Sequence, residues 1–205
     1  MDEEVQATAA RLVRRLKEGN HTITVAESCT GGLLASAFTD IAGASQWFRQ
    51  SWVTYSNDAK IKELGVTEEA LNRRGAVSAE VAIQMAQGAR VKADASIALS
   101  ITGIAGPSND GSNKKIGTVY VGIASENWAN SDITEIGGNR AENKIAFVHF
   151  ALLTAIKYWD RAMAKEEVAR KEEESRVAAE EDAKLQFEEE RARREAEAKE
   201  NAPWQ

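Results

Sequence analysis

The chain has 205 residues, 43% of them hydrophobic, with a single cysteine and a formal net charge of −6 at pH 7. This length allows one domain with a substantial core, and one cysteine excludes an internal disulfide. Because the chain is acidic and has neither a signal-type apolar start nor an apolar run of ~20 residues, we expect a cytoplasmic protein with no nucleic-acid or membrane partner.

Apolar periodicity and turn residues predict helices alternating with strands. The predicted helices cover 4–18 and 31–41, three shorter ones start at the N-caps Asn57, Thr67 and Ser78, and a long one starts near Arg140. The predicted strands are 22–27, 51–55, 96–102, 117–124 and 131–136. This order predicts an α/β three-layer sandwich, a central sheet flanked by helices. The closely spaced last strands predict an antiparallel hairpin, and therefore a mixed sheet.

The segment from Arg161 onward has a different composition, with ten Lys or Arg and fourteen Asp or Glu. Pairs such as Glu167/Lys171 and Glu190/Arg194 recur at the i,i+4 spacing that stabilises an exposed helix. Its few apolar residues do not repeat at heptad spacing, so no coiled coil is predicted. We therefore predict a domain at 1–160 and a charged helical tail at 161–205, with a partly disordered tail as the alternative.

The run 22–32 concentrates reactive side chains at a predicted strand-to-helix turn. Unpaired N–H groups at a helix start carry partial positive charge and suit a phosphate or an oxyanion. The glycines Gly31 and Gly32 allow a ligand to approach the backbone, but their spacing matches neither a P-loop nor a dinucleotide fingerprint. An ordinary N-cap in a strand–helix unit is the alternative interpretation.

Three segments carry a resemblance to a known family: 26–32 (AESCTGG), 54–60 (TYSNDAK) and 101–107 (ITGIAGP). In this order and spacing they resemble the CinA C-terminal domain family, over roughly residues 5–160. Stand-alone members of that family hydrolyse the carboxamide of nicotinamide mononucleotide to nicotinate mononucleotide and ammonia. The resemblance implies this substrate and no metal or organic cofactor, and we also expect a homo-oligomer, with a dimer as the first choice. Lys115 replaces the proline of the family pattern, and Asn139 replaces the aspartate before Arg140.

Hydrolysis of an amide needs a nucleophile, a base and donors for the oxyanion. Ser28, at the predicted turn, is the expected nucleophile, and Lys60 is the expected base if burial lowers its pKa. A lone helical lysine is usually solvated, so the role of Lys60 is implied by the family motif. We expect Glu27 to orient Lys60 or a ribose hydroxyl, and Tyr55 to position the ring or its carboxamide.

The remaining predicted site residues would bind the substrate. They are Cys29, Thr30, Gly31, Gly32, Ser56, Asn57, Thr102, Gly103, Gly106 and Arg140. Arg140 is expected at the 5′-phosphate, because a guanidinium binds phosphate through two parallel hydrogen bonds. The helix start at Gly31 suits either the oxyanion or the phosphate, and we favour the oxyanion there.

Two further functions remain open at this point. One is a Ser-Lys amidase of the same fold that acts on another small amide or nucleotide. The other is a non-catalytic nucleotide-binding or assembly protein that docks through its tail. The sequence has no His/Cys/Asp cluster with metal-ligand spacing, so no metal site is predicted.

Overall fold

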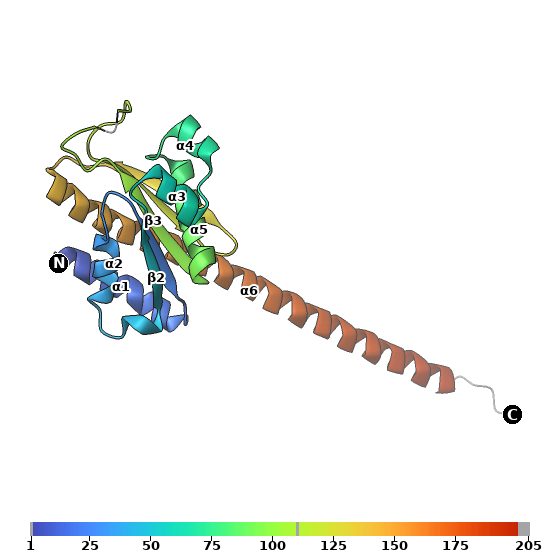
Figure 1. The fold of residues 1–205 in the computed structure, drawn as a ribbon. Coiled ribbons are helices and arrows are strands. Elements are labelled where there is room, and N and C mark those ends of the chain that lie inside the picture. Colours follow the sequence, from blue (N-terminus) through green and yellow to red (C-terminus); the bar gives the residue numbers. More distant parts are fainter. Residues whose placement is uncertain (1, 110, 201–205) are drawn as a thin grey trace. The chain divides into compact units, whose positions relative to one another are not determined.

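The computed structural model describes residues 2–109 and 111–200. The chain forms two compact units, Met1–Tyr158 and Trp159–Gln205. The strands are β1 (Ile23–Glu27), β2 (Phe48–Val53), β3 (Ile97–Gly103), β4 (Thr118–Ala124) and β5 (Ala129–Glu135) (Figure 1). The helices are α1 (Glu3–Glu18), α2 (Leu33–Thr39), α3 (Asn57–Leu64), α4 (Glu68–Arg74), α5 (Ala79–Ala93) and α6 (Arg140–Glu200), with a short 3-10 helix, η1 (Ala44–Gln46), before β2.

The sheet of the first unit is mixed, with strand order β2-β1-β3-β4-β5. β1 runs parallel to both β2 and β3, whereas β4 is antiparallel to β3 and β5. This arrangement confirms the predicted mixed sheet and the late hairpin. The parallel strands β1, β2 and β3 direct their carboxyl ends to one edge of the sheet, which is where ligands bind in such folds.

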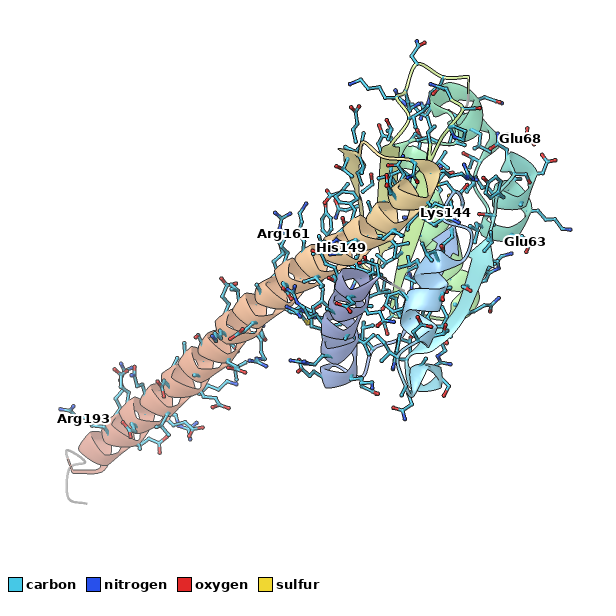
Figure 2. The ribbon with its side chains drawn as sticks, turned by 90° about the vertical axis from the view of Figure 1, so that its left-hand side faces the viewer. Glu63, Glu68, Lys144, His149, Arg161 and Arg193 are labelled. Atoms are coloured by element: carbon cyan, nitrogen blue, oxygen red, sulfur yellow. The ribbon has the colours of Figure 1, made fainter. Side chains whose placement is uncertain are left out.

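Helices cover both faces of this sheet, as the predicted three-layer sandwich requires (Figure 1). On one face, α3, α4 and α5 share a core with β1, β3 and β4. Gly122 of β4 lets α5 approach closely, because a Cβ there would lie 2.2 Å from the carbonyl oxygen of Ala82. On the other face, α1 lies beside the first part of α6, where Thr8 Oγ1 and His149 Nε2 share a hydrogen bond of 3.1 Å (Figure 2).

The element boundaries differ from the prediction at two places near the site. β2 begins at Phe48 rather than Ser51, because Phe48 already pairs with Ile23 of β1. The cap of α3 is Ser56 rather than Asn57, since Ser56 Oγ accepts a hydrogen bond of 3.1 Å from the N–H of Ala59. The predicted caps Thr67 and Ser78 are confirmed.

The start of α6 at Arg140 is also confirmed, and Asn139 caps it. The side-chain oxygen of Asn139 accepts from the N–H groups of Ala141 and Glu142, and the Glu142 carboxylate accepts from the N–H of Asn139. This reciprocal pair is a capping box, which fixes the first turn of the helix. The side chain of Arg140 is therefore presented from a well-defined helix start.

The second unit is helical as far as Glu200, so the predicted long C-terminal helix is confirmed over the described residues. Residues 201–205 lie outside the described residues. The predicted pairs Glu167–Lys171 and Glu190–Arg194 form at 2.7 and 3.7 Å. Across the described residues, no helix is both long and apolar enough to cross a bilayer.

Candidate active site

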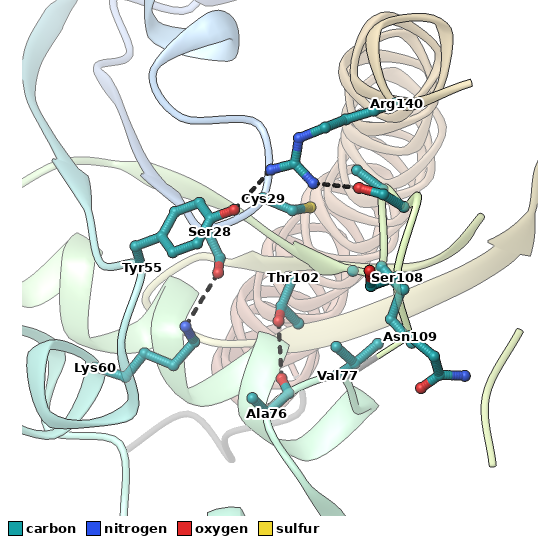
Figure 3. Close-up of a pocket in the computed structure, with 14 residues that line it drawn as sticks. Ser28, Cys29, Tyr55, Lys60, Ala76, Val77, Thr102, Ser108, Asn109 and Arg140 are labelled. Atoms are coloured by element: carbon teal, nitrogen blue, oxygen red, sulfur yellow. Dashed lines mark hydrogen bonds between the residues drawn. The ribbon is translucent and has the colours of Figure 1, made fainter. Parts of the chain in front are cut away.

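A cavity of about 230 Å³ lies beyond the carboxyl ends of β1 and β3, and all three sequence segments contribute to its lining (Figure 3). Eight predicted site residues line it: Ser28, Cys29, Tyr55, Lys60, Thr102, Gly103, Gly106 and Arg140. Residues 76–77, 104–105 and 108–109 complete the lining, and none of these was predicted from the sequence. Glu27, Thr30, Gly31, Gly32, Ser56 and Asn57 lie outside it.

Ser28 and Lys60 meet inside this cavity. Side chains alternate between the faces of a strand, so Ser28 follows Ala26 toward the face that α3 and α5 cover. The N–H of Ser28 extends the β1–β3 ladder by donating to Ile101 at 3.0 Å. From the first turn of α3, Lys60 Nζ reaches 3.1 Å from Ser28 Oγ and donates to the carbonyl oxygen of Thr54 at 2.8 Å (Figure 3).

The ammonium group of Lys60 is held in an environment that disfavours its charge. Only 1% of the residue is exposed. Burial lowers the pKa of Lys60 from 10.5 to about 8. A substantial fraction of Lys60 is therefore uncharged slightly above neutral pH, whereas an exposed lysine is almost entirely charged there. A neutral amine at this distance is able to accept the proton of the Ser28 hydroxyl.

Glu27 points to the opposite face of the sheet and does not orient Lys60, which corrects that expectation. Its carboxylate is fully buried and accepts hydrogen bonds from the N–H groups of Gly32, Leu34 and Ala35, at 3.1, 3.0 and 2.8 Å. The alternation along β1 is the physical reason, since neighbouring residues such as Glu27 and Ser28 face opposite layers. Glu27 is thus the anion that caps α2.

The cap also changes the roles expected for Gly31 and Gly32. An oxyanion or phosphate was expected at this helix start, but the Glu27 carboxylate already occupies the donors at its first turn. A second anion there would meet a buried like charge, which is costly. The expectation that the start of α2 holds the oxyanion is therefore wrong.

Tyr55 and Arg140 close one side of the cavity together. The Tyr55 side chain is well exposed, and its hydroxyl oxygen accepts a hydrogen bond of 2.7 Å from Arg140 Nη2. Arg140 Nη1 donates to the carbonyl oxygen of Gly106 (Figure 3). A single guanidinium thus connects the segment after β2 with the loop after β3 and the start of α6.

Two other predicted substrate-binding groups make structural hydrogen bonds. The Thr102 hydroxyl donates to the carbonyl oxygen of Ala76 at 2.8 Å, which holds the loop before α5 against the cavity. The Ser56 hydroxyl caps α3, and the exposed Asn57 begins that helix. Both polar groups therefore shape the site through the backbone they hold.

Cys29 is buried beside Ser28, and burial raises the pKa of its thiol to about 12. A thiol in this state stays protonated at neutral pH and is a poor nucleophile. Cys29 therefore contributes a small side chain to the lining. Across the described residues, no group of three or more His, Cys, Asp and Glu side chains is placed to hold a metal ion.

Asn143 is a structural element of the site that sequence reasoning missed. It is fully buried, and its amide donates to the carbonyl oxygens of Ala105 and Gly138 at 3.1 and 2.9 Å. It fastens the loop after β3 to the start of α6. A polar residue three positions after Arg140, within an apolar helical pattern, was the available signal. Lys115, the departure from the family pattern, instead pairs with Glu135 at 3.0 Å, outside the lining.

The sequence model of the CinA C-terminal domain matches residues 5–159. The chain belongs to this family. Nicotinamide-nucleotide amidohydrolase PncC of Escherichia coli strain K12 is 47% identical over 123 residues, which make up 60% of this chain and 74% of that protein. A putative competence-damage inducible protein of Caldicellulosiruptor saccharolyticus is 48% identical over 141 residues, 69% of this chain and 34% of that protein. The chain thus matches about a third of the length of that relative.

Solved structures of the family have the same fold. The competence/damage inducible protein CihA of Agrobacterium tumefaciens is 37% identical, with a TM-score of 0.74 over 77% of this chain and 96% of that chain. A CinA superfamily protein of Escherichia coli is 32% identical, with a TM-score of 0.72 over 76% of this chain and 92% of that chain. These comparisons confirm the resemblance and the fold class inferred from the sequence.

Proposed function

We propose that this chain hydrolyses the carboxamide of nicotinamide mononucleotide, producing nicotinate mononucleotide and ammonia. The observation that carries the proposal is the 3.1 Å contact between Lys60 Nζ and Ser28 Oγ inside the cavity. The name of the Escherichia coli relative, a nicotinamide-nucleotide amidohydrolase at 47% identity, supports the substrate class. The lowered pKa of Lys60 supports its role as the base.

The first half of the reaction acylates the enzyme. Neutral Lys60 takes the proton of the Ser28 hydroxyl while Ser28 Oγ bonds to the carboxamide carbon, and the carbonyl oxygen takes the negative charge. The tetrahedral adduct collapses, the C–N bond breaks, and the proton from Lys60 leaves with the nitrogen as ammonia. Lys60 is neutral again, and the nicotinoyl group is an ester of Ser28.

The second half repeats the same proton transfers with water. Lys60 takes a proton from a water molecule while the water oxygen attacks the ester carbon. Lys60 then returns the proton to Ser28 Oγ when the bond between that oxygen and the ester carbon breaks. The balance is one water consumed for one carboxylic acid and one ammonia released. Lys60 therefore serves as base and acid in each half.

The oxyanion needs hydrogen-bond donors close to Ser28. Glu27 already occupies the first turn of α2, so that helix start is a poor choice. The backbone N–H groups of Cys29 and Thr30 directly follow the nucleophile and are the donors that we propose. Their position in a tight turn, where Gly31 N–H donates to the Ser28 carbonyl at 3.1 Å, keeps them fixed near the reacting centre.

The test is to incubate purified protein with nicotinamide mononucleotide in EDTA and to measure ammonia and nicotinate mononucleotide. Ser28→Ala and Lys60→Gln should each lose at least ~10³-fold in turnover, since nucleophile and base act as a unit. The matched controls are Ser51→Ala and Lys62→Gln, which alter exposed side chains and should retain activity. Full turnover by Ser28→Ala would overturn the covalent mechanism, and no ammonia from the native protein would overturn the substrate.

The pH profile tests the base separately. Only neutral Lys60 accepts the serine proton, so kcat/KM should rise with pH through about 8 and then level off. A profile that is flat between pH 6 and pH 9 would exclude Lys60 as the titrating base.

A further inference from the structure

Lys144 is a positive charge near the site with no assigned role. It lies one helical turn after Arg140 on α6 and is half-buried (Figure 2). A Cβ built on Gly31 would lie 3.8 Å from Lys144 Nζ, so the ammonium group borders the turn that carries Ser28. In the described part of the chain, the structure records no hydrogen bond or ion pair for this ammonium group.

The charge of Arg140 is likewise uncompensated. Its two terminal nitrogens donate to Tyr55 Oη and the Gly106 carbonyl, and both of these acceptors are neutral. Glu142, the only carboxylate between the two cations in the sequence, accepts from the N–H of Asn139. Glu27, in the segment that leads to Gly31, caps α2. Two cations at i and i+4 share one face of a helix, so their fields add.

We propose that Lys144, together with Arg140, binds the 5′-phosphate of the substrate mononucleotide. This inference rests on the proposed function, which fixes the carboxamide at Ser28. The phosphate is at the opposite end of the mononucleotide from the carboxamide. Lys144 lies one helical turn after Arg140 and does not line the cavity that holds Ser28. A phosphate monoester carries nearly two negative charges at neutral pH, which two cations neutralise.

Lys144 and Arg140 are expected to have different roles in substrate binding. Arg140 also holds Tyr55 and the loop after β3, so its replacement should affect both the phosphate and the reacting centre. Lys144 makes no such contacts within the described residues, so the distinction between a nucleotide and its nucleoside should rest mainly on Lys144.

Equilibrium binding to Ser28→Ala protein tests this assignment without turnover. Titration calorimetry with nicotinamide mononucleotide and with nicotinamide riboside compares ligands that differ only in the phosphate. Adding Lys144→Gln should weaken mononucleotide binding by about tenfold to hundredfold, the value of one charge-assisted contact, and leave riboside binding unchanged. Lys144→Arg, which keeps the charge, should bind the mononucleotide nearly as tightly as the parent protein.

A matched control removes a positive charge at the other end of β1. Lys17→Gln, in the last turn of α1, should bind both ligands as the parent protein does. Equal weakening of both ligands by Lys144→Gln would make Lys144 structural, and no weakening would leave the phosphate to Arg140; either result overturns the proposal. If the native protein releases no ammonia but Lys144→Gln selectively weakens the mononucleotide, the phosphate site stands and the proposed reaction fails.

Discussion

Replacing Lys60 by methionine should separate the proposed role of Lys60 in the reaction from the free energy that its buried charge costs the fold. Methionine has a similar length but no charge, so Lys60→Met removes the buried ammonium group and the proposed base together. The native pKa of about 8 lies well below the ordinary 10.5 because of burial. That difference corresponds to about 3 kcal/mol, since each tenfold change in a proton affinity is worth ~1.4 kcal/mol.

The direction in which stability changes with pH follows from the number of protons that the folded and unfolded states bind. Between pH 8 and pH 10.5 the unfolded chain holds the proton of Lys60 and the folded protein does not. The free energy of unfolding of the native protein therefore rises with pH across this window, and the burial cost is fully present below pH 8. Methionine does not titrate, so the stability of Lys60→Met relative to the native protein should fall by about 2–3 kcal/mol between pH 7 and pH 10.

Urea denaturation of both proteins at pH 7, 8, 9 and 10, followed by circular dichroism, measures this difference. Loss of the hydrogen bonds to Ser28 and Thr54 adds a constant offset, so the change with pH is the informative quantity. Lys62→Met, on the exposed side of the same helix, is the control and should show no such change. A stability difference that stays constant with pH would refute the buried-ammonium argument, whatever happens to turnover.

Three other predictions address the surroundings of the site. Glu27→Gln should lower the free energy of unfolding by about 1.5–3 kcal/mol, because it replaces the carboxylate cap of α2, and an unchanged urea midpoint would contradict this. Cys29 should react slowly with iodoacetamide at pH 8 in folded protein and quickly in urea, since burial raises its thiol pKa to about 12; rapid labelling of folded protein would show an exposed thiolate. Deleting residues after Ala164 should change the melting temperature and turnover little, because the described side chains of 165–195 are all exposed, and a large drop in the melting temperature would show that the tail supports the domain.

The sequence by itself determined most of the element order. Caps such as Thr67 and Ser78, together with the apolar runs between them, indicated the helices and strands correctly, because these signals are local. The charged C-terminal helix could also be predicted from the sequence, because pairs at i,i+4 depend only on the helix that they stabilise. The start of β2 at Phe48 could not be predicted from local sequence, because it depends on pairing with Ile23, twenty-five residues earlier in the chain.

The site divides in the same way. The strand-to-helix turn pointed to Ser28, and the family resemblance implied Lys60. Only the tertiary structure brings them to 3.1 Å, because α3 crosses the face of the sheet to which Ser28 points. The opposite direction of Glu27 follows from the same alternation, and its role as the cap of α2 required knowing which helix lies on the other face. Lys144 is distant in sequence from Gly31, so its approach to the turn after Ser28 depends on packing. Local chemistry could be inferred from local sequence, whereas burial, charge balance and proton affinity depend on neighbours that only the folded chain provides.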